Sequence, residues 1–109
     1  MTANSETRVY PRKVLRAQAR VALPGMPALR AKTIDISLGG LCLMVPEQLP
    51  SGKVCNVGFE APLNGKTVRV FAMAKVVYSI LAGTDGFRTG LQFTEIDAAN
   101  NKLLAEVMI

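Results

Sequence analysis

The chain of 109 residues contains no histidine, no tryptophan and only two cysteines. Without histidine, the commonest general base is missing, and neither a Ser-His nor a Cys-His catalytic pair can form. Two isolated thiols cannot complete the ligand set of a tetrahedral zinc site. The acidic residues are scattered rather than paired. These absences argue against an enzyme, and we expect Cys42 and Cys55, both in apolar stretches, to be buried and reduced.

No apolar run approaches the roughly 18 residues that a membrane span needs. The first residues, Met-Thr-Ala-Asn-Ser-Glu-Thr, also lack the apolar core of a signal peptide. Half of the residues (50%) are hydrophobic and 19% are charged, as in a globular domain of ordinary size. We therefore expect residues 1–7 to be a flexible tail, residues 8–109 to be one domain, and the chain to stay in the cytoplasm without membrane insertion.

Positive charge is concentrated in the N-terminal third of the chain. Of the 13 basic residues, seven precede residue 35, where only one of the 8 acidic residues lies. The remainder, six basic and seven acidic residues, is nearly balanced. This asymmetry favours an anionic partner for the N-terminal third, and a solvated basic arm is the alternative.

Six stretches show strand character, through alternating apolar and polar residues or, at 41–45, through a continuous apolar run. They span residues 16–23, 31–37, 41–45, 54–60, 67–79 and 87–93. Turn-forming sequences separate them, among them Asn64-Gly65, and Gly39-Gly40, where we expect positive φ. From Ile96 onward the apolar residues recur at helical spacing, with Asp97 as N-cap. The pattern predicts an all-β fold: a small six-stranded antiparallel barrel closed by a C-terminal α-helix.

The first functional motif is the pair Arg8 and Arg12. Pro11 disfavours a helix there, and in an extended chain residues four apart lie on one face. Arginine grips phosphate oxygens, or the O6/N7 edge of guanine, with two parallel hydrogen bonds. The pair predicts an arm that folds over an anionic ligand, and a solubilising arm is the plainer alternative.

The second motif is Asp35-x-Ser37-x-x-Gly40, on a predicted strand that enters the Gly39-Gly40 turn. Period-two alternation places Thr33, Asp35 and Ser37 on one face, opposite the apolar face of Ile34, Ile36 and Leu38. A carboxylate accepts hydrogen bonds from N1 and N2 of guanine, and a serine hydroxyl can donate to a phosphate. A plain hairpin with turn-forming residues remains the alternative.

Taken together, the two motifs, in this order and on this strand pattern, resemble the PilZ domain family. Its Arg-x-x-x-Arg motif matches Arg8 and Arg12, and its Asp/Asn-x-Ser-x-x-Gly motif matches Asp35, Ser37 and Gly40. Residues 90–93, Gly-Leu-Gln-Phe, are similar to the family's glycine–phenylalanine strand. The resemblance covers about residues 8–108.

The resemblance implies a PilZ-type β-barrel that is a receptor for the bacterial second messenger cyclic di-GMP and needs no cofactor. It implies that Arg8 and Arg12 contact phosphate and the guanine Hoogsteen edge and that Asp35 holds guanine N1 and N2. Ser37 would bond nearby ligand oxygens, and Gly39 and Gly40 would keep the turn tight. Many members carry an additional arginine at the position of Thr7, and its absence here favours one ligand over an intercalated pair.

The expected output is a change in contact with an unidentified protein partner when the ligand orders the arm. One alternative is a PilZ-like adaptor that works without a nucleotide. Another is a basic barrel that binds nucleic acid, which would need aromatic stacking platforms. The chain has two tyrosines and four phenylalanines, of which Tyr10 alone is suitably placed, so we expect no nucleic-acid partner. Arg16, Arg20 and Arg88 are expected to be ordinary exposed positions on the barrel, and the alternative is that they add positive charge near the pocket.

Overall fold

The structure, a computed structural model, describes residues 10–109. Within that range it contains seven strands, one α-helix and a short 3-10 helix. These are β1 (Lys13–Val14), β2 (Gln18–Ala22), β3 (Leu29–Ile36), β4 (Gly40–Val45), β5 (Val54–Leu63), β6 (Lys66–Leu81), η1 (Gly83–Asp85), β7 (Phe87–Glu95) and α2 (Ala98–Val107). The predicted tail at 1–7 and Arg8 lie outside the described residues.

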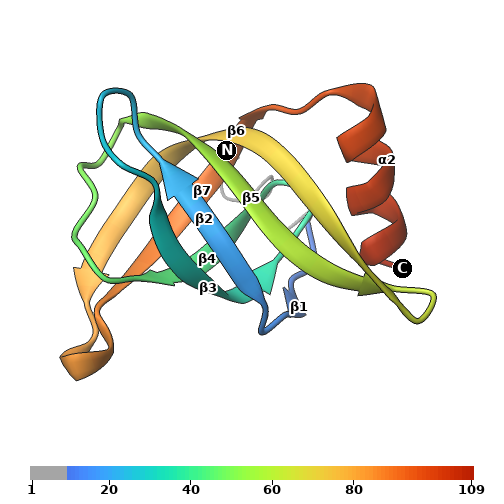
Figure 1. The fold of residues 1–109 in the computed structure, drawn as a ribbon, viewed down its shortest axis with the longest axis horizontal. Coiled ribbons are helices and arrows are strands. Elements are labelled where there is room, and N and C mark those ends of the chain that lie inside the picture. Colours follow the sequence, from blue (N-terminus) through green and yellow to red (C-terminus); the bar gives the residue numbers. More distant parts are fainter. Residues whose placement is uncertain (1–9) are drawn as a thin grey trace, which may run out of the picture.

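All strand pairs are antiparallel, in the order β1-β3-β2-β5-β6-β7-β4, and a further pairing of β3 with β4 closes the sheet. The six strands β2 to β7 therefore form the predicted barrel, and the two-residue β1 is an addition beside β3 (Figure 1). Closure gives β4, the last strand in this order, a partner on each side, β7 and β3, so that β4 is not an edge strand.

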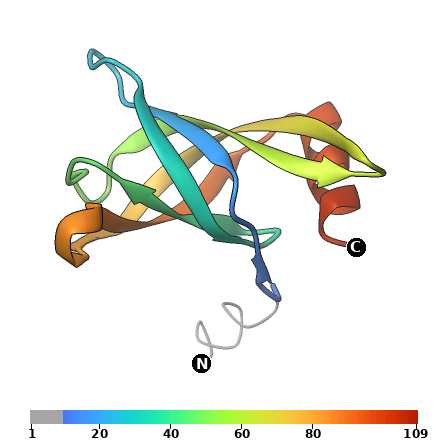
Figure 2. The same cartoon turned by 60° about the horizontal axis from the view of Figure 1, so that its bottom comes forward.

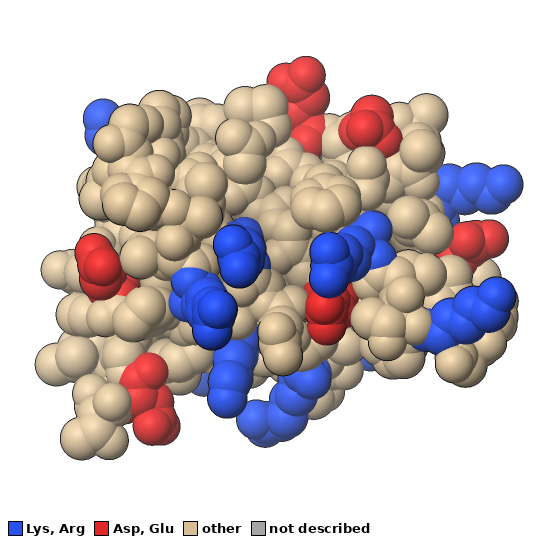
Figure 3. Space-filling model, in the orientation of Figure 1, with Lys and Arg blue, Asp and Glu red and all other residues tan. Residues whose placement is uncertain are grey.

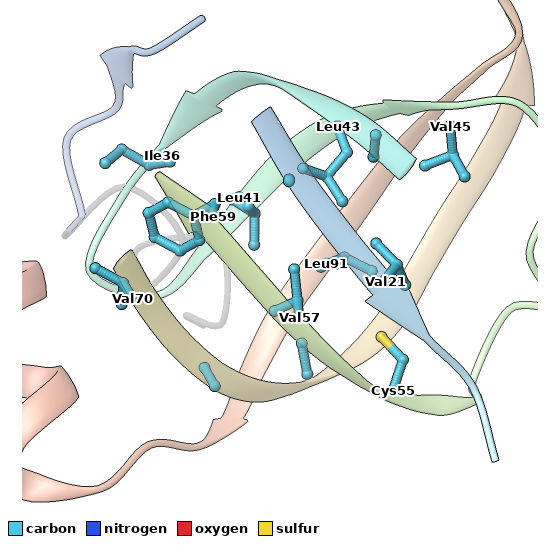
Figure 4. Packing of buried hydrophobic residues seen from close by; sticks show 14 of the residues in the cluster. Val21, Ile36, Leu41, Leu43, Val45, Cys55, Val57, Phe59, Val70 and Leu91 are labelled. Carbon is cyan, nitrogen blue, oxygen red and sulfur yellow. The ribbon is translucent and has the colours of Figure 1, made fainter. Parts of the chain in front are cut away.

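The hydrophobic core consists of the side chains on the inward face of each strand, which fill the barrel. On β5, Cys55, Val57, Phe59 and Ala61 are all buried at period two. Figure 4 shows Phe59, Leu41 and Leu91 converging from different strands on this interior. Each such side chain contributes about 1.5–3 kcal/mol by leaving water. The alternation predicted from the sequence is thus confirmed along β2, β5 and most of β6.

The C-terminal helix packs against β5 and β6, and the short η1 turn lies at the opposite end of the barrel (Figure 2). As predicted, Asp97 is the N-cap: its Oδ1 accepts a hydrogen bond from the backbone N–H of Asn100 at 2.8 Å. That bond lowers the pKa of Asp97. Leu104 and Val107 bury the apolar side of the helix. The Asn64-Gly65 turn is also as predicted, with φ of 53° and 77°.

The strand registers shift at three places, and two of these bulges, at Ile34 and at Val77, reverse the facing that simple alternation predicts. The register of β3 against β4 shifts between Thr33 and Asp35, which turns Thr33 inward to 3% exposure. The expectation that Thr33 shares a face with Asp35 is therefore wrong. Leu38, expected on the apolar face, is 44% exposed, because β3 ends at Ile36 and Leu38 belongs to the following turn.

The second bulge lies in β6, where the register against β7 shifts between Val76 and Tyr78. Val76 faces the core opposite Leu91, whereas Tyr78 pairs with Gly90 and faces outward. Period-two alternation over the predicted strand 67–79 puts Tyr78 in phase with Val76 on the inward face, and the bulge shows that this expectation is wrong. The extra residue, Val77, is exposed.

Candidate ligand-binding site

Arg12 and Asp35 form an ion pair on the outer surface of the barrel. The guanidinium Nη1 of Arg12 donates to Oδ1 of Asp35 at 2.6 Å, across 23 residues of sequence. Pairing of Val14 with Asp35, in the β1–β3 ladder, brings the end of the arm to β3. The arginine side chain is 59% exposed and the carboxylate 19%. The structure thus unites one residue from each predicted motif, whereas Arg8 lies outside its described part.

Two further contacts fasten the residues that flank Arg12. The ring of Tyr10 lies against the backbone of Gly39. On the other side, Nζ of Lys13 donates to the backbone carbonyl of Val107 at 2.8 Å, at the last turn of α2. A cation at a helix C-terminus is favoured by the helix dipole. The arm residues 10–13 therefore contact the β3–β4 turn, β3 and the helix.

Ser37 is buried, with 4% exposure, and its hydroxyl serves the turn that follows β3. Its Oγ accepts hydrogen bonds from the backbone N–H groups of Gly39, at 3.1 Å, and Gly40, at 3.2 Å. The hydroxyl also donates to the carbonyl of Gly40 at 3.3 Å. Ser37 therefore holds the shape of the turn, in the manner of other serine side chains that bond to nearby backbone.

The two glycines of this turn are required because a side chain at either position would lie too close to a neighbouring residue. Neither Gly39 nor Gly40 has the positive φ predicted from the sequence, so that prediction is wrong. A Cβ on Gly40 would lie 2.1 Å from the backbone oxygen of Leu91 on β7. A Cβ on Gly39 would lie 2.8 Å from the ring of Tyr10. Gly40 thus lets β4 approach β7, and Gly39 lets the arm lie on the turn.

An aromatic residue that sequence reasoning missed lies on the same outer surface. Strand register places four residues in one row across β3, β4, β7 and β6: Asp35, Cys42, Gly90 and Tyr78. The Tyr78 ring covers Gly90, where a Cβ would lie 2.3 Å from Cε2, and its hydroxyl is 3.5 Å from Sγ of Cys42. Partial burial is the main cause that raises the pKa of Tyr78. The signal in the sequence was Gly90, because a glycine leaves room for a large side chain on the neighbouring strand. The bulge at Val77 concealed that this neighbour is Tyr78.

The described residues 10–109 contain no cluster of three or more His, Cys, Asp or Glu side chains that would hold a metal ion. Cys42 and Cys55 are both buried and free, as predicted. Burial raises the pKa of the Cys55 thiol to about 11. Within the same part of the chain, no helix has the length and apolar character needed to cross a membrane.

The family model of the PilZ domain matches residues 6–109. The chain belongs to the PilZ domain family. PilZ domains are binding or receptor domains and are generally not catalytic. The paired motif of this PilZ domain therefore lies within a match that covers nearly its whole length. Among curated proteins, no relative is found.

Solved structures share the fold. The inhibitor of motility MotI/DgrA from Bacillus subtilis superposes with a TM-score of 0.75 at 20% identity, over 91% of this chain and 47% of that one. The chain thus spans about half the length of MotI/DgrA. The PilZ domain of YcgR from Escherichia coli, solved with c-di-GMP, gives 0.61 at 16% identity, over 91% and 86%. The PilZ domain of CeSA from a cellulose-synthesizing bacterium gives 0.60 at 19% identity, over 90% and 94%.

Proposed function

We propose that this PilZ domain is a cytoplasmic receptor for cyclic di-GMP. The observation that supports it most is the contact between Arg12 and Asp35, at 2.6 Å, because it joins the two family motifs at one surface. The family to which the chain belongs and the c-di-GMP complex of the similar YcgR domain point to the same ligand. No cofactor and no catalytic step are part of the proposal.

In the proposed complex the ion pair opens, and Arg12 and Asp35 each bind the ligand in place of each other. Asp35 accepts the N1 and N2 hydrogens of one guanine, which match two acceptor oxygens of a carboxylate. Arg12, released from Asp35, and Arg8 then grip phosphate and the Hoogsteen edge of guanine. One ligand is bound per site, in keeping with Thr7 at the position of the additional arginine.

Gly39 and Gly40 let the ligand approach the turn closely. Ser37 was expected to bond the ligand directly, and its burial leads us to revise that role. Its hydroxyl already bonds both N–H groups of the turn and its carbonyl. We therefore propose that Ser37 acts by positioning Gly39 and Gly40.

The proposed output is a change in protein contact. The arm residues 10–13 contact both the turn and the end of α2, so a ligand that displaces Arg12 would also alter the Lys13 contact with Val107. This links ligand binding to the surface around the helix terminus. MotI/DgrA, named an inhibitor of motility, is a similar barrel within a longer chain, which fits a role in a larger assembly.

Isothermal titration with cyclic di-GMP tests the proposal. We expect saturable binding, weakened roughly tenfold or more by Arg12→Ala or Asp35→Ala, since each removes a charge-assisted hydrogen bond. GMP serves as the ligand control, and Lys102→Ala, exposed on α2, as the protein control. Absence of heat at high micromolar ligand, or wild-type affinity in both site variants, would refute the proposal.

The second candidate is an adaptor that binds no nucleotide. The same ion pair favours this candidate, because Arg12 and Asp35 already neutralise each other's charge without a ligand. This candidate predicts a flat titration with cyclic di-GMP and no effect of the nucleotide on capture of a partner protein.

A further inference from the structure

A basic groove runs across the outside of the barrel, over β2, β3, β5 and β6. Its volume is about 1370 Å³. We define it by its five cationic lining residues: Arg16, Arg20, Arg30, Lys32 and Arg69. Figure 3 shows basic side chains gathered on this face, with few acidic ones among them. Of the proposed nucleotide contacts, Arg12 and Asp35 lie in the described part of the chain, and neither lines the groove.

At the centre of the groove, two arginines face each other without compensation. Arg20 on β2 is the direct cross-strand partner of Arg30 on β3, and both are exposed. Like charges directly opposite in a sheet are destabilising. Within residues 10–109, the ion pairs are Arg12–Asp35 and Arg69–Glu60, so no described carboxylate neutralises this arginine pair. Two guanidiniums held side by side are a ready site for carboxylates supplied from outside.

An apolar anchor continues the row of the two arginines. Arg20 also pairs with Gly58 on β5, and Gly58 pairs with Phe71 on β6. The Phe71 ring lies over Gly58, where a Cβ would come within 2.8 Å of it, yet 54% of Phe71 remains exposed. Because Gly58 has no side chain, the groove stays open between the two arginines and the exposed ring of Phe71. Exposed apolar groups beside charge are typical of surfaces that bind protein.

We propose that the basic groove docks an acidic segment of a partner protein, with carboxylates on Arg20 and Arg30 and an apolar side chain on Phe71. Nucleic acid fits less well, because successive bases need several aromatic platforms and Glu60 and Asp85 also line the groove. Pairing of the segment with β2 as an extra strand is excluded, since β2 already has β3 and β5 beside it. Recognition at β2 therefore runs through side chains.

The inference rests on the proposed function for its biological setting, because it names a second surface of the receptor, apart from the one around the end of α2, that recognises a partner protein. The chemistry of the groove is nevertheless separate from that of the nucleotide site. The two proposals can therefore fail independently, and the experiment is designed to distinguish the two failures.

The probe is a fluorescein-labelled peptide of repeated Glu-Leu units, followed by fluorescence anisotropy on the full chain. We expect saturable binding at low salt, at least tenfold weaker for a Gln-Leu peptide of the same length. Arg20→Gln with Arg30→Gln should weaken binding at least tenfold, and Phe71→Ala should weaken it several-fold. Lys102→Ala should leave it unchanged. The groove variants should retain wild-type affinity for cyclic di-GMP, if the wild type binds it.

Equal binding of the two peptides, or unchanged binding by the arginine double variant, would overturn the proposal. Tighter binding of a labelled oligothymidine than of the acidic peptide, lost in the same variants, would overturn it in favour of nucleic acid. The Phe71→Ala variant and thermal melting keep the test decisive if the double variant folds poorly. A flat titration with cyclic di-GMP alongside specific peptide binding would refute the nucleotide proposal and leave the groove standing.

Discussion

Arg12 and Asp35, one residue from each motif, contact each other on the outer surface of the barrel, Nη1 to Oδ1 at 2.6 Å. A ligand at this surface must therefore replace an existing ion pair rather than enter beside free charges. Its affinity is the difference between its own hydrogen bonds and those it displaces. This makes the strength of the ion pair itself the first quantity to measure.

We expect the pair to contribute little to folding. Because 59% of the Arg12 side chain is exposed, solvent screens the interaction, and such pairs are worth about 0–1 kcal/mol. Arg12→Ala should accordingly leave the urea midpoint almost unchanged, so that a loss of ligand binding reports on the site. A shift in free energy of unfolding beyond about 2 kcal/mol would show that the arm is part of the folding unit.

Ser37→Ala should destabilise the domain. The hydroxyl is buried, and its removal leaves the N–H groups of Gly39 and Gly40 without that acceptor. An unsatisfied buried donor costs about 1–3 kcal/mol, which urea unfolding would detect. Ser37→Thr, which keeps a hydroxyl, is the comparison variant. If Ser37→Ala instead lowered affinity for cyclic di-GMP with unchanged stability, direct contact with the ligand would replace the positioning role.

The strand pattern could be predicted because one face of each strand is buried, which imposes a period of two on the sequence. The two bulges that reverse the facing of side chains could not be predicted. Each inserts one residue, Ile34 or Val77, that has ordinary strand character and therefore leaves no mark in the composition. Their effect is large: one buries Thr33, and the other turns Tyr78 to the outer surface near the proposed site.

The residues of the proposed site were chosen from their spacing in the sequence, but the contacts that they make join parts of the chain that are far apart in sequence. The turn at Gly39-Gly40 was correctly placed. The reason that both positions must be glycine is the close approach of Leu91 and Tyr10, which no local sequence pattern reveals. The pairing of Arg12 with Asp35 likewise depends on β1, a two-residue strand too short to show periodicity.

The two glycines of the turn should respond differently to alanine. At Gly40 a methyl group meets the backbone oxygen of Leu91 at 2.1 Å, and a strand backbone cannot yield without breaking the β4–β7 ladder. At Gly39 the neighbour is the ring of Tyr10, an exposed side chain that can move. Gly40→Ala should therefore cost at least about 1–3 kcal/mol, and Gly39→Ala much less, by urea unfolding. Equal costs would contradict this account of the turn.

Alkaline pH should weaken the fold through Cys55. Burial raises the pKa of its thiol from 9.0 to about 11, so between these values the unfolded chain ionises while the native chain keeps the proton. The unfolded state then binds fewer protons, and stability falls as pH rises through this window. One such group contributes a slope of at most about 1.4 kcal/mol per pH unit. Urea unfolding from pH 8 to 10.5 should show the fall, and Cys55→Ala should flatten it relative to the wild type. A thiol reagent at pH 8 should leave native Cys55 unlabelled, and rapid labelling under native conditions would show that this thiol is neither buried nor held in its neutral form.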